Sequence, residues 1–292
     1  MMRYLWIILL AVASTAQSLG QKVDSVARKY FEQGLNYYQD GKLKEALGVW
    51  TDIVNKKMGQ STDIYGVCFF NIPTIYWQLK DNEKAKDWYK KVLASDLKDN
   101  DETGDLMEPH TNYKHKSAVA LAGLYAQDSN FKEVLNWICQ ADTAYRYWGF
   151  EGSATNVSEE QAYLLNWKAQ TLLRLNKKDE AIRELVTQLI CAGHLGGFFG
   201  KELELLLTLL DDMFKSDFAK AIERLRLVKT GESTWQAGFI LRGVTYAIPV
   251  SGVQHNPNVP HYWMELRVEK DQAVDANYLV TKIKSSAFYR AL

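Results

Sequence analysis

The segment from Ala27 to Val54 reads ARKYFEQGLNYYQDGKLKEALGVWTDIV and contains two short amphipathic runs separated by Asp40-Gly41. In each run, small and aromatic residues recur at three- and four-residue spacing, which places them on one face of a helix. An Asp-Gly pair between two such runs indicates a turn. The segment therefore predicts two helices that pack against each other through Ala27, Tyr30, Gly34, Tyr37, Leu43, Ala46, Leu47 and Trp50.

Small residues at Gly34 and Ala46 would let the two helix backbones approach closely, with aromatic side chains filling the space around them. This pattern resembles the tetratricopeptide repeat, W-x2-L-G-x2-Y followed by A-x3-F. The resemblance implies a scaffold that binds other molecules and does not say which. The matching positions are Gly34, Tyr37, Ala46 and the aromatic Trp50, with Tyr30 in the Trp position and Gln33 departing from Leu.

Four later segments align with the first, and each centres on a small or branched residue that corresponds to Ala46. These anchor residues are 39 to 49 positions apart, whereas a regular tetratricopeptide array has a period of about 34 residues. Pro73 falls in the Gly position of the second segment, where it predicts a kink because proline removes a helical hydrogen bond. The expected fold is mainly α, an α-solenoid of about five helical hairpins. The aligned residues are Phe69, Ile72, Tyr76, Ala85 and Tyr89, then Leu121, Ala122, Tyr125, Val134 and Ile138, then Leu165, Ala169, Leu172, Ala181 and Leu185, and finally 216–222 with Ala221.

The C-terminal part has a different pattern. Residues Tyr262 to Val268 alternate apolar and polar side chains, which predicts a half-buried strand, and the β-branched and aromatic runs Phe239–Val250 and Tyr278–Ile283 are candidates to pair with it. An alternative is a sixth helix over 234–247, because Ser233 and Gln236 form a capping-box pattern. The β interpretation is favoured. The expected domains are 1–20, a signal peptide; 21–228, a helical repeat domain; and 229–292, a small β-containing unit.

The first twenty residues are typical of a secretory signal peptide. Arg3 gives a cationic start, Tyr4–Ala13 is apolar, and Ser14-Thr15-Ala16 is a small-x-small cleavage pattern. The apolar run is about half the roughly twenty residues that a membrane-spanning helix needs. We therefore expect an exported protein, periplasmic or secreted, whose mature N-terminus lies between Gln17 and Gln21.

Composition and motifs argue against several functions. The 35 basic and 35 acidic residues leave no excess charge for binding nucleic acid. The acidic stretch Asp99–Asp105 resembles part of a calcium-binding loop, but His110 stands where the bidentate Glu is required, so a solvated loop is expected. His110 and His115 are five residues apart, which separates them on a helix, and ordinary surface histidines are the default. With no nucleophile motif, we expect no enzyme activity, no cofactor and no metal.

Two binding functions are open. The resemblance implies that the first helix of each hairpin lines a groove for a protein or peptide partner. The alternative is a binding protein for glycans or other small polar ligands, because the aromatic residues Tyr145, Tyr147, Trp148 and Phe150 have no packing role in the repeat pattern. The expected groove residues are Arg28, Phe31, Tyr38, Gln39, Phe70, Trp77, Gln78, Lys116, Gln127, Tyr163, Asn166, Gln170 and Arg174.

Overall fold

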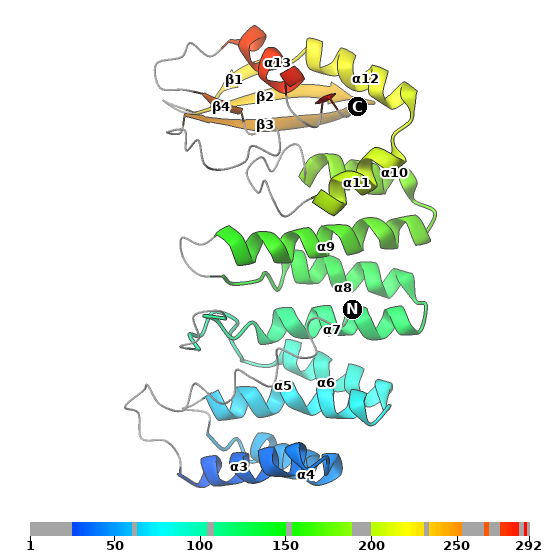
Figure 1. Ribbon diagram of the computed structural model, residues 1–292. Helices are drawn as coiled ribbons and strands as arrows, with labels where there is room; N and C mark the ends of the chain where they lie inside the picture. The colour runs from blue at the N-terminus through cyan, green and yellow to red at the C-terminus, as the bar shows by residue number, and fades with distance from the viewer. Residues whose placement is uncertain are drawn as a thin grey trace. The chain divides into compact units, whose positions relative to one another are not determined.

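The computed structural model describes residues 25–59, 63–103, 108–149, 154–188, 200–230, 234–252, 266–268, 275–285 and 289–290. The chain divides into two compact units, Met1–Val157 (unit 1) and Ser158–Leu292 (unit 2). Most of the described residues are helical, and a small sheet lies near the C-terminus (Figure 1). The predicted fold, mainly α with successive helical hairpins and a small C-terminal β-containing unit, is confirmed.

The described residues of unit 1 form three helical hairpins. Each consists of two antiparallel neighbours joined by a short turn, and the first hairpin has the helices and the turn that the segment Ala27–Val54 predicts. The three pairs are α3 (Ser25–Gln39) with α4 (Leu43–Asn55), α5 (Asp63–Gln78) with α6 (Asn82–Ala94), and α7 (Tyr113–Gln127) with α8 (Phe131–Thr143).

The same turn joins the two helices of every hairpin. A residue with positive φ stands two positions before the second helix, and the next residue donates its backbone N–H to a carbonyl five positions earlier. This is the Schellman motif, which satisfies the carbonyl groups at the end of the first helix. In α5–α6 the left-handed residue is Lys80 (φ 65°), and Asp81 N–H donates to the Tyr76 carbonyl at 2.9 Å. Asp81 also starts α6, because its carboxylate accepts the Lys84 N–H.

The helices of the first hairpin approach closely at Gly34. A Cβ atom at this position would lie 2.3 Å from Trp50 Nε1, so only glycine leaves room for the indole. Trp50 is buried and stacks against Phe31 and Tyr38, with ring centroids 6.4 and 5.8 Å away. The anchor residue Ala46 is fully buried beside them.

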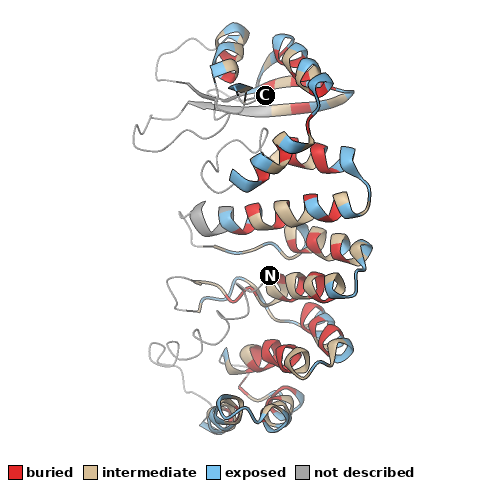
Figure 2. Cartoon of the chain, turned by 45° about the vertical axis from the view of Figure 1, so that its right-hand side comes forward, coloured by how far each residue is buried: buried red, intermediate tan, exposed pale blue. Residues whose placement is uncertain are grey.

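Helix α5 is buried over a continuous stretch from Cys68 to Ile75 (Figure 2). The helix continues through Pro73 to Gln78, and the kink that the sequence predicts at this proline stays a prediction. Around α5 the aromatic rings interlock: Phe69 meets Trp88 edge-on at 5.8 Å. A helix that is apolar on all sides is expected to be enclosed by its neighbours.

Unit 2 joins helices to a sheet. The strand order is β1-β2-β3-β4, with the first three antiparallel and β4 parallel to β3. The elements are α9 (Ala154–Arg174), α10 (Lys178–Val186), α11 (Gly200–Leu209), α12 (Asp212–Glu223), β1 (Arg226–Lys229), β2 (Thr234–Leu241), β3 (Val244–Gly252), β4 (Leu266–Val268) and α13 (Ala276–Ser285).

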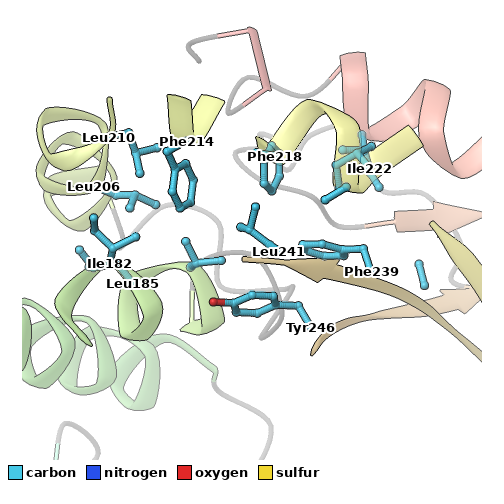
Figure 3. Close-up of a cluster of buried hydrophobic side chains, with 14 of the residues drawn as sticks. Ile182, Leu185, Leu206, Leu210, Phe214, Phe218, Ile222, Phe239, Leu241 and Tyr246 are labelled. Atoms are coloured by element: carbon cyan, nitrogen blue, oxygen red, sulfur yellow. The ribbon is translucent and has the colours of Figure 1, made fainter. Parts of the chain in front are cut away.

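One hydrophobic cluster connects the helices of unit 2 with the sheet (Figure 3). Phe218 of α12 is fully buried and meets Phe239 of β2 edge-on, with ring centroids 5.9 Å apart. The cluster also includes Leu206 of α11 and Leu279 of α13. The helices therefore cover one face of the sheet, as the alternation of apolar residues along β2 requires.

The structure changes two expectations for the C-terminal part and confirms part of a third. The run Phe239–Val250 forms strands, but Arg242 and Gly243, both with positive φ, divide it into a two-residue hairpin, so the alternative helix over 234–247 is wrong. Tyr278–Ile283 belongs to helix α13 and not to a strand, because Asp275 caps the helix and buried residues four apart, Leu279 and Ile283, face the core. Leu266–Val268 of the predicted strand is confirmed, and 262–265 lie outside the described residues.

The predicted domain boundaries stay predictions. The boundary at 228/229 falls within β1 and inside unit 2, and residues 1–20 lie outside the described part of the chain. None of the helices in the described residues combines the length and the apolar composition that crossing a membrane requires.

Candidate functional site

The first helices of unit 1 meet at a pair of polar side chains from the predicted groove. Gln78 Nε2, at the end of α5, donates a hydrogen bond of 2.6 Å to the Tyr38 hydroxyl at the end of α3. The neighbouring Trp77 is only partly buried, and Lys80 Nζ lies 5.8 Å from its ring centroid. The structure thus brings together three predicted groove residues, Tyr38, Trp77 and Gln78, from two hairpins.

Asn71 is a polar residue of this region that the sequence reasoning missed. It lies on α5 seven residues before Gln78, which puts the two side chains on the same side of the helix, two turns apart. Asn71 is 8% exposed. An amide in an otherwise apolar run was the available signal. A carboxamide carries both donors and an acceptor, so this position is a candidate for contact with a ligand.

The junction between α6 and α7 is polar as well. Lys86 is 5% exposed, and its ammonium group pairs with Asp128 and with Glu83 while lying 4.7 Å from the Tyr125 ring centroid. Burial alone would lower the pKa of Lys86, but the two carboxylates more than offset this and raise it. This site was not predicted. Nearby, Asn82 donates to the predicted groove residue Gln127 at 3.3 Å.

Other predicted groove residues of unit 1 have packing or pairing roles. Phe70 is 5% exposed, and its ring packs against Tyr89 and Tyr113, because α5 is enclosed on that side too. Phe31 stacks on Trp50 inside the first hairpin. Lys116 pairs with Glu108, Arg28 pairs with Glu32, and Gln39 is exposed.

Four predicted groove residues lie on α9 in unit 2. Gln170 Nε2 donates to Asn166 Oδ1 at 2.7 Å, and burial raises the pKa of Tyr163 to about 12. Arg174 is exposed. Asn166 also bonds to the buried carboxyl of Glu202, whose pKa is raised by burial and whose Oε2 has no partner among the described residues. The predicted set is therefore divided between the two units.

The second region of interest is the loop that carries the aromatic cluster. Trp148 is 49% exposed, and its backbone is paired twice with Asn112: Trp148 N–H donates to Oδ1 at 2.7 Å, and Nδ2 donates to the Trp148 carbonyl at 2.9 Å. Tyr145 and Tyr147 are partly buried. Phe150 lies outside the described residues.

The polar residues that hold this loop correct two expectations. His115 is not a surface histidine: it is 2% exposed, its Nδ1 lies 2.7 Å from the Tyr145 carbonyl, and its ring meets Tyr147 edge-on. Asp99 is not a simply solvated residue, because its carboxylate accepts the N–H groups of Lys114 and His115 in the first turn of α7. Burial raises the pKa of this carboxyl, and these two hydrogen bonds partly offset the increase.

In the described residues, no group of three or more His, Cys, Asp or Glu side chains is arranged to hold a metal ion. Cys68 is fully buried, and burial raises the pKa of its thiol, which keeps it in the unreactive protonated form. The polar groups that the structure assembles are amides, hydroxyls and ion pairs between helices, which suit binding.

Comparison with known proteins identifies the repeat. Residues 69–99, which include most of α5 and all of α6, match the tetratricopeptide repeat family model. No curated protein sequence matches the chain. Similar solved structures include a putative kinesin light chain of Podosopora anserina with nearly identical TPR-like repeats, 13% identical, covering 65% of this chain and 87% of that chain at a TM-score of 0.39. A substituted form of that protein is also 13% identical. The match covers 64% of this chain and 85% of that chain, at the same TM-score of 0.39.

The interpretation of this chain as tetratricopeptide-like is therefore confirmed by the repeat match, and the hairpins agree with it. Tetratricopeptide repeats generally mediate protein–protein interactions, and their fold is typically a non-enzymatic scaffold.

Proposed function

We propose that this tetratricopeptide-like chain is an exported, non-enzymatic scaffold that binds a protein or peptide partner through the first helices of its hairpins. The observation that carries the proposal is the group formed by Asn71, Trp77 and Gln78 on α5 with Tyr38 of α3. It combines a partly exposed indole with amide groups, within the repeat that the family match covers.

The chemistry of this group suits an extended peptide. A carboxamide carries both donors and an acceptor, so it can pair with the N–H and the C=O of a peptide backbone. Gln78 is held by the Tyr38 hydroxyl, which limits the side-chain entropy that binding would cost. Trp77 provides an apolar anchor of the type that dominates binding hot spots. The Asn71 carboxamide offers a further pairing group on the same side of α5.

The test begins with partners captured from the exported fraction by the full chain and then measures their binding to variants. The double substitution Trp77→Ala and Gln78→Ala should weaken binding at least about tenfold, as loss of a hot spot does. Neither side chain is fully buried, so the melting temperature should change little. Trp148→Ala is the matched control, because it removes an exposed tryptophan of the same unit outside the group. Undiminished capture by the double variant would exclude this face.

Export is the second part of the proposal, and it rests on the sequence of residues 1–20. The short apolar run followed by Ser14-Thr15-Ala16 favours cleavage of a signal peptide. N-terminal sequencing of the protein from its native source should give a first residue between Gln17 and Gln21. A membrane-bound protein that retains Met1 would contradict export as a soluble chain.

A further inference from the structure

An exposed indole stands apart from the α5 group. Among the described residues of unit 1, Trp148 and Val26 are the large apolar side chains that are about half exposed, at 49% and 54%. Val26 lies in the first turn of α3. Trp148 lies in the segment after α8, and its indole does not pack between two helices. Helix packing therefore does not explain a tryptophan at this position.

The backbone beneath this indole is held by buried polar side chains. Asn112 is fully buried and has a left-handed backbone (φ 51°), which asparagine tolerates better than most residues. Its carboxamide makes the two hydrogen bonds to the Trp148 backbone, and His115 holds Tyr145 three residues earlier. The indole is thus presented on an ordered backbone, and a ligand that binds there would not have to order the loop.

Two polar side chains continue the surface next to Trp148. The His110 ring lies 6.2 Å from the Trp148 ring, at an interplanar angle of 70°. His110 pairs with Glu102 across an antiparallel bridge, and residues directly opposite each other in such a pair project to the same side, with Cβ atoms about 5 Å apart. Glu102, His110 and Trp148 therefore form a row.

The two polar side chains of this row offer hydrogen-bond acceptors. His110 Nδ1 lies 3.1 Å from the Asn100 carbonyl, so Nδ1 carries the proton and Nε2 of the neutral ring is an acceptor. Glu102 is exposed and His110 is partly exposed, so both side chains are accessible to a ligand. A ligand that matches the row supplies an apolar face for the indole and hydroxyl donors for the two acceptors.

We propose that Glu102, His110 and Trp148 form a carbohydrate-binding site in unit 1, separate from the α5 group. The apolar C–H face of a pyranose ring stacks on the indole, and its hydroxyl groups donate to Glu102 and His110 Nε2. An anionic ligand is disfavoured because Glu102 repels it. A cationic side chain is less well suited, because Arg146 is exposed two residues from Trp148.

The test uses the full chain and soluble neutral hexasaccharides of glucose, mannose and N-acetylglucosamine, with binding measured by calorimetry and by saturation-transfer NMR. At least one should bind at millimolar or lower concentration, and Trp148→Ala should weaken that binding at least about tenfold. Glu102→Gln and His110→Phe should each weaken it by a smaller factor. Trp77→Ala is the matched control and should bind the sugar as the unchanged chain does. The Asn112 pairing uses the backbone of residue 148, so Trp148→Ala should keep the fold.

Three results would overturn the inference: no hexasaccharide binds the unchanged chain, Trp148→Ala binds as tightly as the unchanged chain, or Trp77→Ala loses the sugar equally. A further arm uses Nα-acetyl-lysine methylamide, whose side-chain ammonium group is free, as a cationic probe. If this probe binds through Trp148 and no sugar does, the row accepts a basic peptide side chain and the carbohydrate assignment is wrong. Failure here is distinguishable from failure of the scaffold proposal, because partner capture is tested with the Trp77 and Gln78 variant.

Discussion

In unit 1 each helix packs mainly on the helix next to it in the chain, whereas in unit 2 helices α10 to α13 and the strands contribute to one shared cluster. Both units contain the same hairpin turn: the α9–α10 turn repeats it with Asn176 in the left-handed position. This hairpin turn is therefore common to both units, and the units differ in what packs against the second helix of a hairpin. Where hairpins cover one another, we expect substitutions to act locally. Where a sheet closes the core, one substitution should affect many elements.

The largest effect is expected in the shared cluster. Phe218→Ala should lower the free energy of unfolding of unit 2 by about 3–5 kcal/mol, because it removes a fully buried ring and leaves a cavity. Hydrogen exchange should increase in α12, in the sheet and in α13 together, since Phe218 contacts Phe239 of β2 and shares one cluster with Leu279 of α13. Denaturant unfolding and hydrogen exchange measure the two quantities.

The matched control is on the same helix. Met213 is 70% exposed, so Met213→Ala should change stability by less than about 0.5 kcal/mol. If Phe218→Ala increased exchange in α12 alone, the cluster would not act as one core, and the contrast with unit 1 would fail.

The second prediction tests local packing in unit 1. Ala46→Leu should cost about 1–3 kcal/mol, because the fully buried site beside Trp50 has no room for a larger side chain. Exchange should increase first in α3 and α4 and then, to a smaller extent, in α5, which is the neighbouring helix. An unchanged thermal melt would show that Ala46 is not a contact between helices.

The hairpins of unit 1 could be predicted from sequence because helices such as α4 and α8 place their buried residues at helical spacing. The shared turn could not. Its left-handed position is occupied by Gly41, Lys80, Ser129 and Asn176 in the four hairpins, and neither lysine nor serine is a residue whose identity indicates positive φ. The repeat is thus conserved in backbone conformation and not in the residue that adopts it.

The sheet and the candidate sites were also harder to predict, because the residue types at their turns and contacts do not indicate the structure that forms. Arg242 and Gly243 turn the chain inside an apolar run that has no Asn-Gly or Asp-Gly pair, and helix α13 depends on a cap by Asp275 and on a core formed by distant residues. The row of Glu102, His110 and Trp148 is assembled by one β-bridge and one ring contact between separate segments. Such contacts carry no fixed spacing in the sequence.

The third prediction compares two glycines of the first hairpin. Gly34→Ala should destabilise unit 1, because its Cβ would lie 2.3 Å from Trp50, which Phe31 and Tyr38 hold in place. The packing cost of about 1–3 kcal/mol exceeds the gain of up to about 1 kcal/mol that alanine brings to a helix interior. Gly48 of α4 has no atom within 4 Å of its Cβ position, so Gly48→Ala should show only the gain. Thermal melts that shift in the same direction for both variants would contradict this packing.

The smallest effect concerns alkaline pH and two tyrosines of unit 1. Burial raises the pKa of Tyr89 to about 12, although its hydrogen bond with Thr74 partly offsets the shift, and burial also raises the pKa of Tyr113. An unfolded tyrosine loses its proton near pH 10. Between about pH 10 and 12 the unfolded chain therefore binds fewer protons than the native chain, and native stability falls as pH rises.

Tyr89→Phe isolates this contribution, because phenylalanine keeps the ring and does not titrate. At neutral pH the substitution should cost about 1 kcal/mol, since it removes the hydrogen bond to Thr74. Above pH 10 the unchanged chain should lose stability faster than the variant, by up to about 1.4 kcal/mol per pH unit, so the difference between them should narrow. Denaturant unfolding at pH 9, 10 and 11 measures both slopes. Parallel slopes would mean that Tyr89 is ionised as readily in unit 1 as in the unfolded chain, and the enclosure of α5 and α6 that distinguishes this unit would have to be reconsidered.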